Sequence, residues 1–268
     1  MSDATKEDIR TSVRERYKQS AQQSESCCGG GSSCSCGSQS SESFGYSAAE
    51  LSSLPEGADL SLGCGNPTAI AGLKEGETVL DLGSGAGIDC FLAAARVGES
   101  GSVIGVDMTP EMLSKARKNA QSGGYHNVDF RLGEIENLPV RDGSVDAIIS
   151  NCVINLSPDK PRVFAEAHRV LKTGGRISVS DLVLKSPLPA ELRDNMALLT
   201  GCIAGAIPKA QYLDAIESAG FASVTVESES AYAKFEHLSS LAREAGIDDE
   251  ATRLIADTVV SVTITAIK

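Results

Sequence analysis

The feature that most constrains the fold of this chain is a regular alternation of strand-like and helix-like segments between Thr78 and Leu184. Short aliphatic runs are followed by stretches with apolar residues at helical spacing, and glycine or proline separates the two kinds of segment. Such alternation is typical of βαβ units, which build a parallel sheet with helices packed on its faces. The sequence therefore predicts an α/β fold for this part of the chain.

The boundaries of these elements can be predicted from the residues. The predicted strands are "TVLDLG" (78–83), "SVIGVDM" (102–108), "VDFRLGE" (128–134), "VDAIIS" (145–150) and "RISVSDLV" (176–183). Two helices are predicted at 87–98 and 110–124, and a third with Ser157 as N-cap, Pro158 as first residue and Gly174–Gly175 as stop. After Leu184 the pattern is mostly helical. Strands predicted at 222–228 and 259–267 form either a hairpin at the sheet edge or part of a small second domain.

A glycine-rich loop, "DLGSGAGID", joins the first predicted strand to the first predicted helix. Gly83, Gly85 and Gly87 allow a tight turn, and the helix N-terminus offers free N–H groups to a ligand. Asp107 ends the next strand, where it is well placed to accept hydrogen bonds from ribose hydroxyls. The loop, its strand, its helix and this acid together indicate a nucleotide-like ligand.

NAD is the competing ligand for such a loop. Asp81 precedes the loop and can direct a carboxylate at a cationic ligand. Glu134 follows the third strand, where it can accept an adenine amino proton. No tyrosine–lysine or histidine pair suits hydride transfer. These three features speak against NAD.

Four segments of the chain resemble the class I S-adenosylmethionine-dependent methyltransferases: "VLDLGSGAGIDCFLAAA", "VIGVDMTPEML", "RLGEIENLPV" and "RVLKTGGRISVSD". The resemblance implies a Rossmann-like sheet with helices on both faces, and S-adenosylmethionine as the cofactor. It implies that the glycine loop cradles the methionine end, that the second strand holds ribose and adenine, and that Asn151 lines the methyl-donor end. The cofactor residues implied in this way are Asp81, Gly83, Ser84, Gly85, Gly87, Asp107, Met108, Glu134, Ile135 and Asn151.

Charge and composition limit the classes of partner. The formal net charge of −12 argues against nucleic acid and anionic membranes, because phosphate contacts need clustered Lys and Arg. The N-terminus is charged and lacks the apolar core of a signal peptide, and the longest uncharged apolar stretch, 196–208, is too short to span a bilayer. We therefore expect a cytoplasmic protein whose eight cysteines stay reduced, without a disulfide framework.

The cysteines fall into two groups. Four of them, Cys27, Cys28, Cys34 and Cys36, lie in a Gly- and Ser-rich arm that we expect to be flexible. Outside the arm, Cys90 sits beside apolar helix residues and is predicted to be packing, because free cysteine is often a small buried hydrophobe. Cys64 and Cys202 stand among glycines in predicted loops, where a buried thiol has little to pack against. For Cys152, at the end of a strand in "SNCVINLSPDK", burial and function remain equally open.

Thiols near a methyl donor suit two kinds of ligand. Zinc binds thiolates, but the chain has no CxxC pair outside the arm and only three histidines, so no tightly bound metal cofactor is expected. Trivalent arsenic takes three sulfur ligands and keeps a lone pair that can attack a sulfonium methyl group directly.

The motifs "SLGCGNPTAIAGLKEGETVLDLGSGAGIDCF", "ISNCVINLSPDK" and "GCIAGA" resemble those of the arsenite methyltransferases, and this resemblance runs from about Val13 to Phe221. It implies that Cys64, Cys152 and Cys202 are arsenic(III) ligands and that Cys27 or Cys28 takes part in catalysis as a redox thiol. Two departures are visible. The arm adds further cysteines, and no cysteine follows Cys202.

The resemblance implies an enzyme that methylates arsenite, free or as a thiol conjugate, for detoxification, with a reductant such as thioredoxin or a glutathione-type thiol as partner. The expected organisation is an N-terminal helix and arm (1–46), a donor-binding domain (47–188) and a small α+β arsenic-binding portion (189–268). Two alternatives remain: a small-molecule carbon or oxygen methyltransferase with structural cysteines, and a metal-binding protein built on the cysteine arm.

Overall fold

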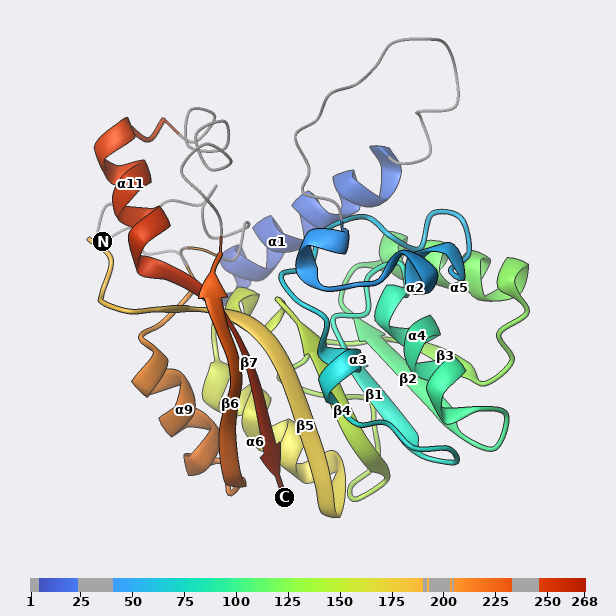
Figure 1. Cartoon of the computed structure of the whole chain (residues 1–268). Coiled ribbons are helices and arrows are strands. Elements are labelled where there is room, and N and C mark those ends of the chain that lie inside the picture. The colour runs from blue at the N-terminus through green and yellow to red at the C-terminus, as the bar shows by residue number, and fades with distance from the viewer. Residues whose placement is uncertain (1–4, 24–40, 190–191, 193–202, 204, 233–245) are drawn as a thin grey trace, which may run out of the picture.

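The computed structural model describes residues 5–23, 41–189, 192, 203, 205–232 and 246–268 (Figure 1). Its strands are β1 (Thr78–Leu82), β2 (Ser102–Asp107), β3 (Val128–Leu132), β4 (Val145–Asn151), β5 (Leu171–Leu184), β6 (Ala222–Ala231) and β7 (Val259–Ile267). The α-helices are α1 (Lys6–Gln23), α2 (Ala48–Ser52), α3 (Pro67–Ile70), α4 (Ile88–Val97), α5 (Pro110–Gly123), α6 (Lys160–Val170), α9 (Lys209–Ser218) and α11 (Asp249–Thr258). Two short 3₁₀ helices are η1 (Ser41–Phe44) and η2 (Ile154–Leu156).

The described strands form one seven-stranded sheet in the order β3-β2-β1-β4-β5-β7-β6. The first five run parallel, and β7 is antiparallel to both β5 and β6. The strand order reverses at β1, because β2 and β4 lie on either side of it. In open parallel sheets, ligands bind at the carboxyl ends of the strands beside such a reversal.

Helices cover both faces of the sheet, as the alternation of side chains along β1 requires. Val79 packs with α4 and α5 in one apolar cluster, whereas Leu80 and Leu82 pack with α6 and α9 in another. A third cluster includes Leu184 of β5, together with Val13 of α1 and Ile255 of α11. The predicted α/β class, with a Rossmann-like parallel sheet covered on both faces, is confirmed.

The two C-terminal strands belong to this same sheet. β7 pairs with β5 along its whole length, from Arg176↔Ile267 to Leu184↔Val259, and β6 pairs with the outer side of β7. The chain between β6 and β7 includes α11, so the pair is an edge extension and not a tight hairpin. The arm with its four cysteines lies outside the described residues.

One predicted helix start was wrong by two residues. The helix was expected to have Ser157 as its N-cap, but α6 begins at Lys160 and its N-cap is Asp159, which accepts a hydrogen bond from the backbone N–H of Arg162. Ser157 instead donates to Glu136 and accepts from the backbone N–H of Asp159. The hydroxyl is therefore used to close the preceding turn.

The end of this helix also differs from the prediction. α6 stops at Val170, and β5 begins at the next residue, before the expected stop at Gly174–Gly175. Pairing of Leu171 with Val145 and an ion pair between Lys172 and Asp146 hold this segment against β4. Pairing with β4 therefore makes residues 171–173 part of a strand, although the sequence predicts that the helix continues to Gly174.

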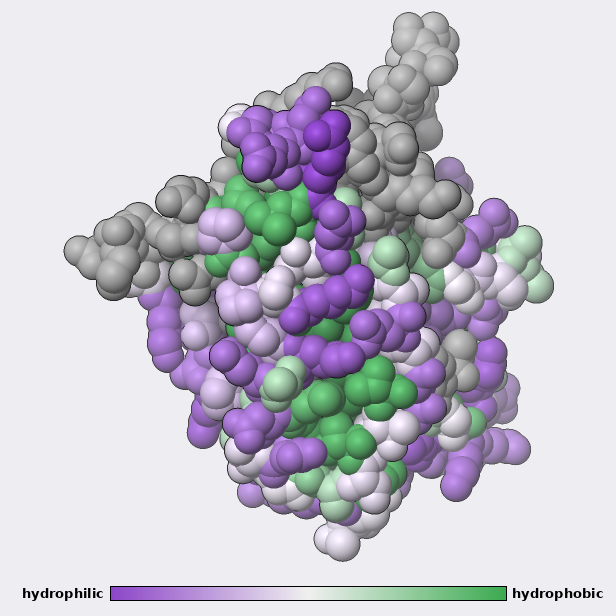
Figure 2. All heavy atoms as spheres, turned by 60° about the vertical axis from the view of Figure 1, so that its left-hand side comes forward, coloured by the Kyte–Doolittle hydropathy of each residue, from purple (hydrophilic) through white to green (hydrophobic). Residues whose placement is uncertain are grey.

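None of the helices in the described part of the chain is long and apolar enough to cross a membrane. Figure 2, which brings the left-hand side of Figure 1 forward, shows hydrophobic areas interspersed among hydrophilic ones. The large apolar side chains that are exposed on α11, β6 and β7 are Leu254, Val226 and Ile267.

Candidate active site

A pocket opens at the carboxyl ends of β1, β2 and β4, beside the point where the strand order reverses. The glycine loop forms its floor, and Met108 and Ile135 add apolar walls. Further lining residues are Arg10, Val13 and Tyr17 of α1. An apolar pocket with a few convergent polar groups is typical of small-molecule sites.

Asp107 is held rigidly at the end of β2. Its carboxylate accepts hydrogen bonds from the backbone N–H groups of Gly85, at 2.9 Å, and Thr109, at 2.8 Å. Gly85 has φ of 52°, and a side chain there would meet no atom within 4 Å, so the backbone borders open space. Gly83 differs, because a Cβ there would come within 2.4 Å of the side chain of Val153. The absence of a side chain at Gly83 therefore lets the loop pack closely against the residues that follow β4.

The pocket concentrates buried negative charge. Burial and the neighbouring charge of Asp89 raise the pKa of Asp81 well above its usual value, and burial raises the pKa of Asp89 to about 6. Burial also raises the pKa of Asp107, against the hydrogen bonds from Thr109 and Gly85. Among the described residues that line this pocket, the one basic side chain is Arg10, which forms ion pairs with Glu134 and Glu136. The pocket therefore suits a cationic ligand.

Ser84 gives a second indication that a ligand belongs here. It lines the pocket, and its buried hydroxyl has no hydrogen-bond partner within the part of the chain that the structure describes. Buried polar groups are normally paired, so such a group points to an absent partner. The open backbone at Gly85, the orphan hydroxyl and the excess negative charge together fit a nucleoside-type donor with a cationic centre.

Asn151 connects this pocket to the loop that carries Cys64. Its amide nitrogen donates to the hydroxyl of Tyr46 (2.8 Å), the carbonyl of Gly65 (2.8 Å) and Asp89 (3.2 Å). Its amide oxygen accepts from the backbone N–H of Cys64 at 3.0 Å. The loop and the pocket are therefore joined through a single half-buried amide.

The two glycines that flank Cys64 allow this loop to approach the sheet closely. A Cβ at Gly63 would lie 2.7 Å from the amide nitrogen of Asn151. A Cβ at Gly65 would lie 2.7 Å from the side chain of Ser180 on β5. The segment "GCG" therefore lies too close to the sheet for side chains at positions 63 and 65. This close approach explains why glycine flanks Cys64 on both sides.

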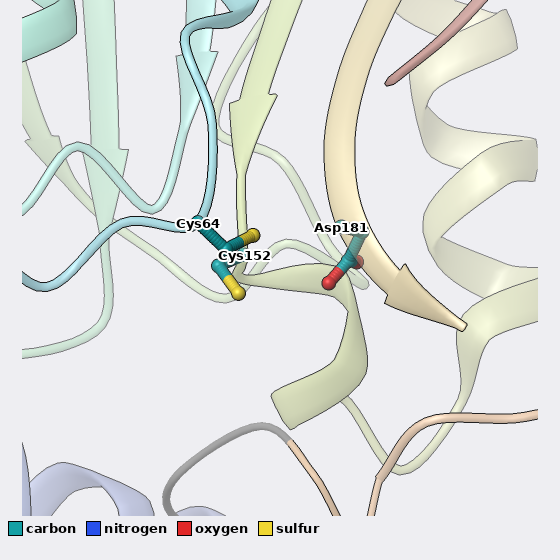
Figure 3. A group of neighbouring side chains, drawn as sticks. All are labelled: Cys64, Cys152 and Asp181. Atoms are coloured by element: carbon teal, nitrogen blue, oxygen red, sulfur yellow. The ribbon is translucent and has the colours of Figure 1, made fainter. Parts of the chain in front are cut away.

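Cys64 and Cys152 meet beside Ser180, in the C-terminal half of β5. The backbone N–H of Cys152 donates to the carbonyl of Ser180 at 2.8 Å, and the thiol of Cys64 donates to the same carbonyl at 3.5 Å. Both thiols are buried, and one ligand atom from each lies within 4.8 Å of the other and of the carboxylate of Asp181. Figure 3 shows the carboxyl group of Asp181 directed toward the two cysteines from β5. Cys152 also lines the pocket, so the thiol cluster borders it.

The predicted donor residues are mostly gathered in one place. Asp81, Gly83, Ser84, Gly85, Asp107, Met108, Ile135 and Asn151 all line the pocket. Gly87 does not line it; with φ of 102° it is the N-cap of α4, and a Cβ there would strike Phe91. Glu134 also lies outside the lining, where it pairs with Arg10 and Arg14 of α1.

The other cysteines have different settings. Cys90 is fully buried in the cluster around α4, as predicted, and its thiol donates to Asp81 at 3.1 Å. Burial and the charge of Asp81 raise the pKa of this thiol well above its usual value, so it stays protonated. Cys202 lies outside the described residues, as do the arm cysteines Cys27 and Cys28.

Sequence reasoning missed several residues of the site. Asp89 was visible at the end of the glycine loop motif, and Asp181 at the end of a predicted strand, but neither was assigned a role. Tyr46 carries no local signal, since only the fold brings it to Asp89, to which its hydroxyl donates at 2.8 Å. Tyr212 of α9 likewise reaches Asp181 only through the packing of that helix, and the two groups lie 3.0 Å apart.

Comparison with known proteins identifies relatives of this chain. Residues 73–235 match the model of a family described as methyltransferase domain. The arsenite methyltransferase of Halobacterium salinarum is 50% identical over 236 residues, which are 84% of this chain and 60% of that protein. The human arsenite methyltransferase is 43% identical over 138 residues, 48% of this chain and 37% of the relative. The chain therefore spans about three fifths or less of these relatives.

A solved structure is similar over most of the chain. The arsenic(III) S-adenosylmethionine methyltransferase of Chlamydomonas reinhardtii has a TM-score of 0.63 and 39% identity, and the match covers 77% of this chain and 67% of that one. The geranyl diphosphate C-methyltransferase of Streptomyces coelicolor, at 18% identity and a TM-score of 0.58, shares the fold.

Proposed function

The chain belongs to the methyltransferase-domain family, and from this premise we propose that it transfers a methyl group from S-adenosylmethionine to trivalent arsenic held by cysteine thiolates. One observation carries the proposal. Two buried thiols, Cys64 and Cys152, converge at the strand ends immediately beside an anionic pocket that suits a cationic donor. The 50% identity with an arsenite methyltransferase supports it.

The donor would be held by the residues that line the pocket. Asp107 would accept hydrogen bonds from the ribose, and Asp81 and Asp89 would offset the positive charge of the donor. The donor supplies an electrophilic methyl group on a sulfonium centre. The chain supplies binding, orientation and exclusion of water, and orientation alone can account for a large part of such a rate enhancement.

The thiols would hold the acceptor. Thiolates are the form that binds arsenic, and they exchange with the hydroxyl or thiol groups that arsenite carries. We assign the third sulfur to Cys202 from the sequence. No general base is needed, because arsenic attacks with a lone pair and has no proton to lose. The lone pair forms the new arsenic–carbon bond while the methyl group leaves its sulfur with the bonding electrons on that sulfur.

This transfer oxidises arsenic from the trivalent to the pentavalent state. Two thiols can return the two electrons by forming a disulfide, and a reductant such as thioredoxin or a glutathione-type thiol then restores the thiols by exchange. We propose that Cys27 or Cys28 acts in this step. Because free thiols are needed throughout, we place the reaction in the reducing cytoplasm.

The test is incubation with labelled S-adenosylmethionine, arsenite and a thiol reductant, followed by arsenic speciation. We expect methylated arsenic from the parent and none from Cys64→Ser or Cys152→Ser, while calorimetry shows unchanged donor binding in both. Cys90→Ser should keep substantial activity, because serine can still donate to Asp81. Arsenite methylation at the parental rate by the Cys152 variant would exclude the proposal.

A further inference from the structure

Asp181 is the acidic member of the thiol cluster. Its side chain is fully buried in the C-terminal half of β5, and a carboxylate oxygen lies within 4.8 Å of the sulfur atoms of Cys64 and Cys152. The carboxyl group is directed at the cysteines in Figure 3. A buried charge in this position requires an explanation, because burial is costly unless the charge is paired or hydrogen-bonded.

The surrounding groups fix the carboxylate in one orientation. Its Oδ1 accepts two hydrogen bonds, from the side-chain amide of Asn155 at 2.8 Å and the backbone N–H of Leu182 at 2.9 Å. Its Oδ2 accepts one, from the hydroxyl of Tyr212 at 3.0 Å. Each carboxylate oxygen can accept two hydrogen bonds, and the one side-chain donor directed at Oδ2 among the described residues is the hydroxyl of Tyr212.

Asn155 supplies a second acceptor in the same neighbourhood. It is almost completely buried, and its Oδ1 has no hydrogen-bond partner among the residues that the structure describes. Its amide nitrogen is already committed to Asp181 and to the carbonyl of Leu182. A buried acceptor beside two thiols, with a second buried acceptor on the residue that orients it, suits a ligand that binds sulfur and also carries a hydrogen-bond donor.

Arsenous acid is such a ligand. When it reacts with two thiols, As(OH)₃ and two RSH give (RS)₂AsOH and two water molecules, and each thiol proton leaves with a displaced hydroxide. Neither arsenic nor sulfur changes its oxidation state. The third valence of the bound arsenic then carries a hydroxyl, which is a donor. In a methylated arsenical held by two thiols the third valence carries carbon, which is not.

We propose that Asp181 accepts a hydrogen bond from the hydroxyl of arsenite bound to Cys64 and Cys152, and so makes the site prefer arsenite over arsenicals whose third valence is carbon. This inference rests on the proposed function and concerns the capture step, before a third thiol displaces the hydroxyl. A carbon substituent in the same place would leave a desolvated acceptor unpaired, which is the kind of mismatch that buried polar groups discriminate against most strongly.

The experiment measures binding without turnover. Arsenite and phenylarsine oxide are compared by equilibrium dialysis with arsenic quantification, in the full chain carrying Cys202→Ser so that the hydroxyl stays on the arsenic. Adding Asp181→Asn should weaken arsenite binding at least tenfold and leave phenylarsine oxide binding nearly unchanged. In the Asp181→Asn variant, the donors from Asn155 and Leu182 should keep the amide oxygen in the position of Oδ1. The amide nitrogen then occupies the position of Oδ2, where it cannot accept a hydrogen bond from bound arsenite.

Two further variants make the result decisive. Tyr212→Phe removes the hydroxyl that orients Oδ2. It should lower the ratio of arsenite affinity to phenylarsine oxide affinity by a smaller factor than Asp181→Asn does. This variant also tests the proposal if Asp181→Asn does not fold. Asp146→Asn, near the start of β4 beside Lys172, should leave the ratio unchanged. Equal weakening of both ligands, or no change in the ratio, would overturn the assignment of Asp181.

Failure of this inference is distinguishable from failure of the proposed function. If arsenite binding does not depend on Cys64 and Cys152 at all, the arsenic site itself is wrong. If it depends on both cysteines but the ratio of the two affinities is the same with and without Asp181→Asn, the arsenic site stands and only the role of Asp181 falls.

Discussion

Cys152 has a backbone conformation that few residues adopt. Its φ is +58°, in the left-handed region that disfavours side chains with a Cβ, and its N–H is nevertheless bonded to the carbonyl of Ser180. Strained backbone of this kind is frequent at functional sites. Here it turns the chain sharply after β4 and brings the thiol to Cys64 and Asp181.

The strain predicts an unusual ranking of two inactive variants. Cys152→Gly should be more stable than Cys152→Ala by about 0.5–1 kcal/mol. Glycine adopts the left-handed conformation without strain, and this gain exceeds the extra entropy that glycine gives to the unfolded chain. Urea unfolding measures the difference. The same pair of substitutions at Ser150, within β4, should give the reverse order. A less stable glycine variant at position 152 would show that the turn is not strained.

Among the residues proposed to bind the donor, Asp107 has well-defined surroundings. Asp107→Ala should weaken S-adenosylmethionine binding by about 1–3 kcal/mol, because a charged acceptor is lost and the N–H groups of Gly85 and Thr109 lose their partner. Calorimetry of donor binding measures this. Asp129→Ala, at an exposed carboxylate on β3, is the matched control and should leave the affinity as it is. Parental affinity in the Asp107 variant would remove this residue from the donor site.

At the scale of elements, the loop with Cys64 has less freedom than its glycines suggest. Gly65→Ala places a methyl group against Ser180, whose side chain and backbone belong to a central part of β5 and cannot retreat. We expect loss of arsenite binding with retention of donor binding, and a stability loss of about 1–3 kcal/mol. Dialysis with arsenite and calorimetry with the donor separate the two effects.

The control for this prediction is Gly72→Ala. A Cβ at Gly72 meets no atom within 4 Å, although its φ of +54° makes any side chain unfavourable there. That variant should lose stability and keep arsenite binding. If Gly65→Ala bound arsenite as the parent does, the loop would have to be free to move away from β5, and its role in placing Cys64 would be lost.

The elements themselves were largely predictable. β1, β2, β3 and β4 and the helices α4 and α5 follow from aliphatic runs, a proline at a helix start and glycines at helix ends, all of which are local signals. The start of α6 was not, because Ser157 and Asp159 both suit an N-cap and only the contact of Ser157 with Glu136 decides between them. The long β5 depends on pairing with β4 and β7, which no local pattern contains.

At the scale of the whole molecule, the site depends on contacts between segments that are far apart in the chain. The sequence indicated Cys64 and Cys152, whose motifs resemble a family, but not Asp181, because a buried aspartate at a strand end has no distinctive neighbours in the sequence. Tyr46 and Tyr212 are still harder to find, since each reaches its carboxylate through the packing of a separate element. Glu134 was predicted to meet adenine from its position after β3, whereas in the structure it pairs with Arg10 and Arg14 of α1.

Three carboxylates that line the pocket, Asp81, Asp89 and Asp107, make a contribution to the stability of the protein whose pH dependence has a definite sign. Burial raises the pKa of Asp89 to about 6, from an unfolded value of about 3.9, and raises those of Asp81 and Asp107 as well. For acids whose pKa is raised on folding, the contribution to folding stability is fully present below the unfolded pKa and is lost as the pH rises through the folded pKa. In the protein without donor, the stability that these three groups contribute should therefore decrease between about pH 4 and 6.

Donor binding should have the opposite dependence. A cationic donor stabilises the ionised carboxylates and lowers their pKa, so its affinity should rise through this window and level off above about pH 6. If binding lowers the pKa of one carboxylate by about 1, the affinity rises by about tenfold. Calorimetry at pH 5 and pH 7.5 measures it, and Asp89→Asn should flatten the curve. S-adenosylhomocysteine lacks the sulfonium charge and should show a shallower rise, because less positive charge faces the same carboxylates. Equal pH dependence for the two ligands would mean that the carboxylates do not face the sulfonium, and the electrostatic account of donor recognition would be wrong.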